Sequence, residues 1–539
     1  PIQLAQAVRE LARFALVRID RRAIIVHRLV QALLRDDLTS DERVRYQHDV
    51  HLVLAASSPK DPDNSAAWPR YAELVAHVTS PVTNLASCTV REVRAFALET
   101  VRYLYRSGAR ESARSLAERL IQQWTEESGP EADVVIDAQR HLGNALRELG
   151  RYQEAYAANS ANLERCRRVL GERNPLTLAI MNAFGADMRA HGDFAEALQN
   201  DEESLELHTE VFGPNQRQTL RVMNNLALDY GLNSEFERAR DQHQRTYLLM
   251  RDAQSALTSE ISALTSEILN SWNGLARALR LCGNYTAARD VGEEALDFGR
   301  EKLNAEHFYT LRAAIDLSIA LRLIATSYED ALELAMETYS RCDVVLGPGN
   351  PDTLAAAISL TNIQRTMDRI DDALELAEVT VERYPAVYGP DHPYVHGCSA
   401  NLALMRRVSG DKAGARSLNE TALAGLDGRL GRDHLYSLTV ATNLASDLFE
   451  LGETVGALKL SKDTLTRLRQ LLGHNHPLTL GCAANTVVDL RAVGSDEEAT
   501  RLFEDTLTHY RATLGDRHPD TIAAAEGRRL DFDFDPPPI

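Results

Sequence analysis

Arginine recurs along this chain at one position of a sequence period close to 42 residues, in seven of nine successive units. Asparagines and two further arginines stand where they would share the same helical face or lie beside it. A guanidinium binds a carboxylate through paired N–H groups, and an asparagine amide can pair with both polar groups of a peptide backbone. The pattern predicts a groove for an extended peptide that has acidic side chains or a free C-terminal carboxylate. The predicted groove residues are Arg147, Arg189, Arg221, Arg280, Arg312, Arg322, Arg365, Arg407 and Arg491, with Asn182, Asn224, Asn225, Asn273, Asn362, Asn401 and Asn443.

The same arginines allow a structural interpretation. They can pair with acidic residues on neighbouring helices, such as the segment NDEESLEL at 200–207, and so only stiffen a helical stack. Arginines whose charges are fully compensated within the stack would favour this second interpretation. Unpaired arginines that face solvent would favour the peptide groove.

A short motif marks the period that positions these residues. GERNPLTL at 171, GPGNPDTL at 347 and GHNHPLTL at 473 end on a residue, nearly always apolar, that recurs at steps of 42 or 43 with a single step of 49. Each unit continues with a large apolar residue followed by a small one, then in most units a glycine, and then an alanine. Glycine commonly ends a helix and proline commonly begins one. Each unit is therefore predicted to be two helices, A and B, joined by a turn.

This large–small pattern in helix A, with alanine early in helix B, resembles the tetratricopeptide repeat. The 42-residue period with L-G-x-x-H-P-x-T-L between units resembles the kinesin-light-chain type of that repeat, over residues 94–526. The resemblance implies an all-α fold, a right-handed superhelical solenoid of about ten helical pairs whose A helices line an inner groove.

The single step of 49 residues contains an exact duplication, SALTSEI, written twice over 255–268. Seven residues are nearly two helical turns, so Leu257, Ile261, Leu264 and Ile268 would stay on one face. We therefore expect a lengthened, partly helical connection that protrudes from the edge of the solenoid. The duplication is either neutral at that edge or a contact surface.

Residues 1–93 do not follow the period, and they are predicted to form a winged-helix-like adaptor with linker helices: a helix, a hairpin around Asp20, and another helix. The phrase IIVHRLVQALLR, with Trp68-Pro69 and RYAELVAHV after it, resembles the joining segment of bacterial STAND (NB-ARC) ATPases. It is most similar to the tetratricopeptide proteins of actinobacterial FxSxx-COOH peptide-modification systems. The resemblance implies an ATPase, yet the chain has no G-x-x-x-x-G-K-[ST] motif.

Because the chain begins at Pro1 without methionine, we expect a fragment that serves as the sensor arm of a longer ATPase. By the same resemblance, the winged helix would be an intramolecular spacer and not a DNA reader. His27 could be a catalytic or metal residue, but a lone histidine between a strand and a helix is expected to be structural.

The C-terminal tail, residues 527–539, ends in LDFDFDPPPI, where Phe532 and Phe534 alternate with three aspartates. Such a segment resembles the short acidic tail of the same family. We expect it to seal the exposed apolar end of the last repeat, because solenoids need caps. Autoinhibitory occupation of the arginine groove is the alternative.

The rest of the composition excludes several classes of function. Six scattered cysteines without a Cys-x-x-Cys pair predict a reducing cytoplasm and no zinc site, and a net charge of −19 argues against a nucleic-acid partner. No membrane span and no catalytic motif stand out, so no enzyme activity, metal or cofactor is predicted. The sequence predicts a non-enzymatic scaffold that binds a peptide or protein. The competing prediction is an assembly platform that drives oligomerisation, including self-association, and binds no separate peptide.

Overall fold

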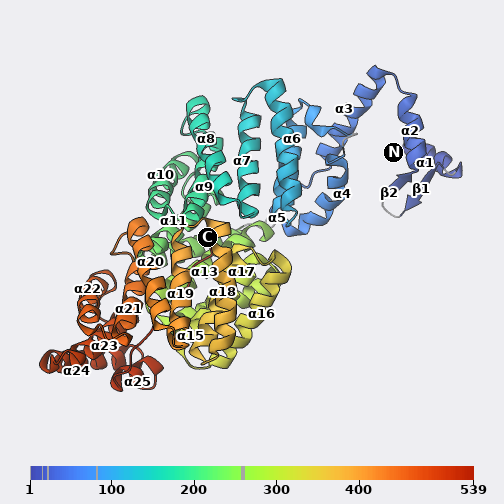
Figure 1. Cartoon of the computed structure of the whole chain (residues 1–539). Helices are drawn as coiled ribbons and strands as arrows, with labels where there is room; N and C mark the ends of the chain where they lie inside the picture. Colours follow the sequence, from blue (N-terminus) through green and yellow to red (C-terminus); the bar gives the residue numbers. More distant parts are fainter. Residues whose placement is uncertain (1, 15, 21–22, 81–82, 257–260, 539) are drawn as a thin grey trace. The chain divides into compact units, whose positions relative to one another are not determined.

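The structure is a computed structural model that describes all residues except 1, 15, 21–22, 81–82, 257–260 and 539. The chain divides into two compact units, residues 1–129 and residues 130–539. Each unit is described by itself below (Figure 1). The domain boundary predicted at residue 94 stays a prediction, and the first helical pair after it belongs to the first unit.

The first unit contains the predicted helix, hairpin and second helix. Its two strands pair antiparallel from Val17 opposite Val26 to Asp20 opposite Ala23. His27 is the N-cap of the helix that follows, where its Nδ1 accepts a hydrogen bond from Leu29 N at 3.3 Å, so its role is the expected structural one. The elements are α1 (Ile2–Arg13), β1 (Val17–Asp20), β2 (Ala23–Val26), α2 (Arg28–Asp36), α3 (Ser40–Ala56), α4 (Trp68–Val78), α5 (Arg91–Arg106) and α6 (Arg110–Ser128), with short 3₁₀ turns at Ser65–Ala67 and Leu85–Ser87.

The second unit is a solenoid of helices. None of its described residues forms a strand. Each helix packs on the next along the chain, and each A helix also packs on the A helices before and after it. This confirms the predicted all-α repeat fold. The helices are α7 (Asp133–Glu148), α8 (Tyr152–Leu170), α9 (Pro175–His191), α10 (Phe194–Phe212), α11 (Arg217–Leu232), α12 (Phe236–Ala256), α13 (Ile261–Leu281), α14 (Tyr285–Lys302), α15 (Phe308–Ile324), α16 (Tyr328–Leu346), α17 (Pro351–Thr366), α18 (Ile370–Tyr388), α19 (Pro393–Val408), α20 (Lys412–Leu430), α21 (Leu435–Glu450), α22 (Thr454–Leu472), α23 (Pro477–Ala492), α24 (Asp496–Thr513) and α25 (Pro519–Ala525).

The repeated motif sets where the A helices begin. In α9 and α17 an asparagine is the N-cap, and its Oδ1 accepts a hydrogen bond from the backbone N–H two residues later. In α15, α19, α21, α23 and α25 a histidine Nδ1 has the same role. Helix α9 ends at Gly192, whose φ of 90° is in the left-handed region that favours glycine. The repeated motif thus supplies the N-cap of one A helix, and the glycine supplies the C-cap at its other end.

The SALTSEI duplication lies between α12 and α13. Both helices have 21 residues, against 16 in α11 and 18 in α14, so the described parts of the duplication are helical. Leu257 lies outside the described residues, as do the side chains of Ile261 and Leu264, whereas Ile268 is buried in the core. The predicted protrusion stays a prediction.

The cap histidines also join repeats that are far apart in the sequence. While His434 Nδ1 accepts from the Tyr436 N–H, its Nε2 donates to Leu232 O at 2.7 Å, about 200 residues earlier. His476 and His518 repeat the contact with Leu281 O and Leu323 O, both at 3.0 Å. Each contact spans five repeats, so the superhelix completes one turn every five repeats and successive turns touch.

The close approach of the turns also selects glycine. A Cβ on Gly192 would lie 2.6 Å from the Pro393 Cδ, which is too short for any contact between carbon atoms. The neighbouring His392 Nε2 reaches Arg189 O at 3.5 Å, the longest of the four histidine contacts. Burial lowers the pKa of His392 to about 3 and the pKa values of His434 and His476 to about 4.

These histidines make the stacking of turns pH-dependent. Unfolded histidine takes up a proton near pH 6.5, whereas the buried neutral rings do not, so we expect the free energy of unfolding to fall as the pH drops from about 6.5 towards 4. Each histidine can contribute up to about 3 kcal/mol to this fall. Denaturant unfolding at neutral and at acidic pH measures the effect.

The matched control replaces all three histidines, His392, His434 and His476, with asparagine, which caps the equivalent helices at Asn174 and Asn350 but does not titrate. The triple variant should lose stability at neutral pH, because three of the four histidine contacts between turns are gone, and it should show a shallower pH dependence. The same slope in both proteins would contradict the assignment.

Candidate functional site

The C-terminal tail runs through the interior of the second unit. Residues 528–538 form neither helix nor strand, and they run back among the repeats, where Pro537 O accepts a hydrogen bond from Tyr394 of α19 (Figure 1). The favoured expectation, that the tail seals the last repeat, is therefore wrong for most of its length. Near that end, Leu530 packs beside Leu480 and Tyr510, and the Phe532 ring lies against Gly481 of the same helix, α23.

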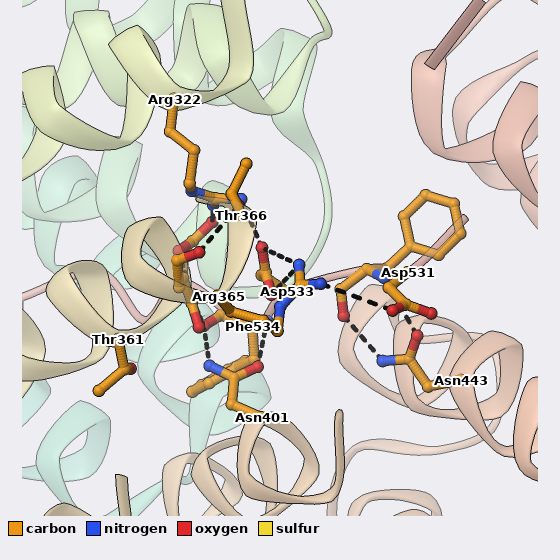
Figure 2. Close-up of polar contacts among 12 residues, drawn as sticks. Arg322, Thr361, Arg365, Thr366, Asn401, Asn443, Asp531, Asp533 and Phe534 are labelled. Atoms are coloured by element: carbon orange, nitrogen blue, oxygen red, sulfur yellow. Dashed lines mark hydrogen bonds and ion pairs between the residues drawn. The ribbon is translucent and has the colours of Figure 1, made fainter. Parts of the chain in front are cut away.

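Three asparagines at the same position of successive A helices bind the tail backbone. Asn401 on α19 donates from Nδ2 to Phe534 O at 2.7 Å, and its Oδ1 accepts from Phe534 N at 2.8 Å (Figure 2). Asn443 on α21 pairs in the same way with Phe532, at 2.7 and 3.1 Å. Asn485 on α23 pairs with Leu530, at 2.8 Å for both bonds. The tail thus advances two residues per repeat, in the direction opposite to the order of the repeats.

The odd-numbered tail residues direct carboxylates at the arginines. Arg365 on α17 binds Asp533 at 3.0 Å and Asp531 at 3.5 Å (Figure 2). Arg322 on α15 binds Asp535 at 2.7 Å and also binds Asp533. Side chains on alternate sides are what an extended strand-like segment presents.

Further contacts hold the two ends of this acidic run. Asp535 accepts from Asn362 Nδ2 at 2.9 Å and lies 3.9 Å from Arg280 of α13. Asp531 binds Arg407 of α19. Burial alone would raise the pKa of Asp531, but the charges of Arg407 and Arg365 and the hydrogen bond from Arg407 hold it below its usual value.

The even-numbered residues place phenyl rings against glycines of the A helices. The Phe534 ring is almost fully buried, edge-on to Tyr394 and Tyr436, and a Cβ on Gly397 would lie 2.6 Å from it. The Phe532 ring lies over Gly481 in the same way. The prolines that follow are buried too, and Tyr394 Oη donates to Pro537 O at 3.0 Å.

The groove arginines fall into two classes. In the first class, the partner is an aspartate 40 residues later on the next A helix: Arg147 binds Asp187 at 2.8 Å and Arg189 binds Asp229 at 2.9 Å. Arg407 belongs to this class because it binds Asp447, and it also binds Asp531 of the tail. These pairs match the structural interpretation.

In the second class, the next A helix has no such aspartate. The equivalent positions after Arg280, Arg322 and Arg365 are Ala320, Ile363 and Met405, each buried and without a carboxylate. These three arginines are themselves largely buried, and the tail supplies the carboxylates that they contact. Arg280 also lies 4.0 Å from Asp316 of the stack, and the charges of Arg322 and Arg365 act on Asp520 of α25.

The tail also completes the first class. Phe449 stands where the period calls for arginine, which would leave the fully buried Asp489 without its partner. Arg529 takes that place: it binds Asp489 at 2.5 Å and lies over the Phe449 ring. This ion pair anchors the start of the tail.

The remaining predicted residues make contacts within the repeats. Arg221 binds Glu267, Arg312 binds Asp352 at 2.9 Å, and Arg491 lies over the Phe503 ring. Asn225 donates to Asn182 at 2.9 Å. Asn224 contacts His243 at 3.2 Å, and Asn273 donates to Tyr309 O at 2.9 Å.

The period that predicts Asn401 and Asn443 also predicts Asn485, which occupies the same repeat position. Three other tail-binding residues, Gly397, Gly481 and Tyr394, were absent from the predicted set. Gly397 and Gly481 share another repeat position, directly after the motif, but a glycine there gives no sign of a phenyl ring. Tyr394 had no signal.

Other kinds of site find no support in the described part of the chain. There, no group of three or more His, Cys, Asp or Glu side chains could hold a metal ion, and every helix is too short or too polar to cross a bilayer. All six cysteines are unpaired, and five of them are buried.

Comparison with known proteins agrees with the repeats. One model of the tetratricopeptide repeat matches residues 134–207 and 188–252, and a second matches 268–309, 353–394, 437–478 and 479–520, together more than half of the chain. The chain is a tetratricopeptide-repeat protein. Such repeats indicate a scaffold for protein–protein interaction, a class that is typically non-enzymatic.

Solved structures similar to this tetratricopeptide-repeat protein have low identity to it. A putative kinesin light chain of Podosopora anserina with nearly identical TPR-like repeats has 22% identity over 38% of this chain and 96% of its own, with a TM-score of 0.31. BtubC (BKLC) from P. vanneervenii has 16% identity over 47% and 91%, with a TM-score of 0.34. A Rap protein complexed with Competence and Sporulation Factor has 14% over 76% and 99%, with a TM-score of 0.45. A search of curated proteins finds no match.

The asparagine contacts predict a local effect on the tail. In the variant Asn443→Ala, the backbone N–H and C=O of Phe532 each lose the hydrogen bond to Asn443. This loss should weaken docking of this part of the tail by about 1–3 kcal/mol. We expect amide hydrogen exchange at Phe532 to become about 10- to 100-fold faster. Asn225→Ala removes an asparagine at the same repeat position that makes no recorded contact with the tail, and it should leave Phe532 exchange unchanged. Equal effects of the two variants would contradict the site.

Proposed function

We propose that this tetratricopeptide-repeat protein is a non-enzymatic scaffold whose inner groove binds an extended segment of a partner peptide or protein. The observation that supports the proposal is the asparagine ladder, in which Asn401, Asn443 and Asn485 each pair with both polar groups of one backbone residue. Backbone pairing of this kind tolerates any side chain, so it suits a ligand from another chain as well as the tail. The arginines of the second class then select carboxylates.

The two classes of arginine bear on the rival interpretation, an assembly platform. Arg147 and Arg189 are compensated within the stack, which is the structural role. Arg322 and Arg365 contact carboxylates of an extended segment, which is the contact expected of a peptide groove. The second observation favours peptide binding in the central repeats, and the first accounts for the arginines of the early repeats.

The wider context of the proposal rests on the sequence resemblance. The first unit contains the helix, hairpin and helix from which the sequence predicts a winged-helix spacer of the STAND (NB-ARC) type. In that context the protein is the sensor arm of a larger regulatory ATPase in the cytoplasm of a bacterium, linked to a modified-peptide (FxSxx-COOH) system. The free, scattered cysteines support the cytoplasmic location.

Selection from a random peptide library tests the groove. The protein to use ends at Leu530, because this end keeps the Arg529–Asp489 ion pair and removes the segment that fills the groove. We expect it to retain peptides with acidic side chains or an acidic C-terminus. The variant Arg280→Glu, Arg322→Glu, Arg365→Glu in the same shortened chain should lose them, because each substitution turns attraction into repulsion.

A matched control distinguishes the groove from general charge. Arg416 is a partly exposed arginine on α20 that pairs with Glu420 and Glu453. Arg416→Glu should leave the selected peptides unchanged. Absence of enrichment with the shortened chain, while circular dichroism shows it folded, would refute the peptide-binding function and leave assembly as the better interpretation.

A further inference from the structure

The tail indicates the chemistry of the ligand more narrowly than the backbone contacts do. Over residues 531–535 its side chains alternate strictly, with carboxylates on the arginine side and phenyl rings on the glycine side of the groove. Each side of the groove accepts one kind of side chain. Gly397 and Gly481 leave room for rings only because they have no Cβ, and the three arginines of the second class have no equivalent aspartate in the repeats.

We propose that residues 531–538 are an internal ligand that keeps the groove occupied, and that the partner segment has the same chemistry, alternating acidic and aromatic residues, and competes with them. This inference rests on the proposed function. It adds the ligand class and the regulation of the site.

The charges explain why a competitor must resemble the tail. Arg322 has only about 6% of its side chain exposed, and Asp533 about 3%. If the tail leaves and nothing replaces it, water enters the groove and the guanidinium groups of Arg280, Arg322 and Arg365 lose their ion pairs with the tail carboxylates, which is unfavourable. An apolar peptide leaves them in that state. A segment with carboxylates at every second residue restores the pairs, so exchange is easy only between like segments.

The geometry at the start of the tail allows such an exchange. Arg529 completes the ion pair with Asp489, and Leu530 packs on the last repeat, so the stack stays complete up to this point. Beyond Leu530, the hydrogen bonds and ion pairs of the tail go to the groove residues described above. Residues 531–538 can therefore leave as a unit without removing the anchor.

The tail is also an imperfect ligand. The buried Nε atoms of Arg280, Arg322 and Arg365 have no hydrogen-bond partner among the described residues, although each of these arginines lies near a tail carboxylate. A donor that stays unpaired in a buried site lowers the affinity of its ligand. A partner segment that reached these atoms would bind better than the tail does.

Fluorescence anisotropy with a labelled peptide tests the proposal. The probe is the synthetic peptide LDFDFDPPPI, residues 530–539, added to the full chain and to the chain that ends at Leu530. A tethered segment acts at an effective concentration near millimolar, so we expect apparent affinity at least about 100-fold higher for the shortened chain. The peptide LNFNFNPPPI, in which the three aspartates become asparagines, should lose most of this binding.

One variant of the full chain keeps the result interpretable if the shortened chain is unstable, and a second variant tests the Phe534 site directly. The full chain with Phe532→Ala and Phe534→Ala keeps every tail carboxylate, so its arginines stay paired while the phenyl anchors are gone. It should bind the probe more tightly than the wild type does. Gly397→Leu in the shortened chain fills the Phe534 site on a helix, and it should abolish probe binding while circular dichroism stays unchanged.

The outcomes separate this inference from the proposed function. Equal probe affinity for the full and shortened chains would overturn the internal ligand. Failure of the probe to bind a shortened chain that still selects library peptides would overturn the ligand class and leave the scaffold function standing. Failure of both the probe and the library with a folded shortened chain would overturn both proposals.

Discussion

A buried guanidinium must have a carboxylate beside it, and this requirement determines the inner face of the solenoid. The period places an arginine near the end of most A helices, where packing of successive helices removes it from water. Desolvation of an unpaired charge would cost several kcal/mol, so every buried arginine has to be compensated. In the early repeats the next helix supplies the aspartate, as in the Arg189–Asp229 pair. In the central repeats that position is apolar, and the tail carries the charges instead.

The sequence was sufficient to predict the repeats because their signals are local and recur. Cap residues such as His434 and Gly192 lie at a fixed distance from each motif. An error in the position predicted for one helix is therefore not carried over to the next. The arginine positions follow from the same period. Their partners do not, because Asp533 lies 211 residues from Arg322 and no rule of spacing joins them. One signal in the sequence could have indicated that these arginines have partners outside the repeats. The aspartate found at 187, 229, 447 and 489 is missing from the equivalent positions 320, 363 and 405.

For the tail, the local conformation was predicted correctly, but the surface on which it docks was not. Alternation of Phe and Asp did predict an extended segment with two different faces, and the structure has that alternation. The apolar end of the last repeat was one candidate surface, and a cap there satisfies the phenyl rings. It leaves the carboxylates without counter-charges. Three carboxylates in five residues need cations at strand spacing, and in this chain the inner arginines meet that need. The polar half of the segment therefore determined its location.

The tail contacts span the same repeats that the contacts between superhelical turns connect. Its contacts extend from Arg280 on α13 to Asn485 on α23, which is as many repeats as one superhelical turn contains. The histidine contacts that join successive turns, such as His476 to Leu281, connect the same two helices, α23 and α13. A segment in the groove and the contacts between turns therefore hold the same closed geometry. A partner that replaced the tail, as proposed above, would either bridge the same repeats or release the constraint between turns.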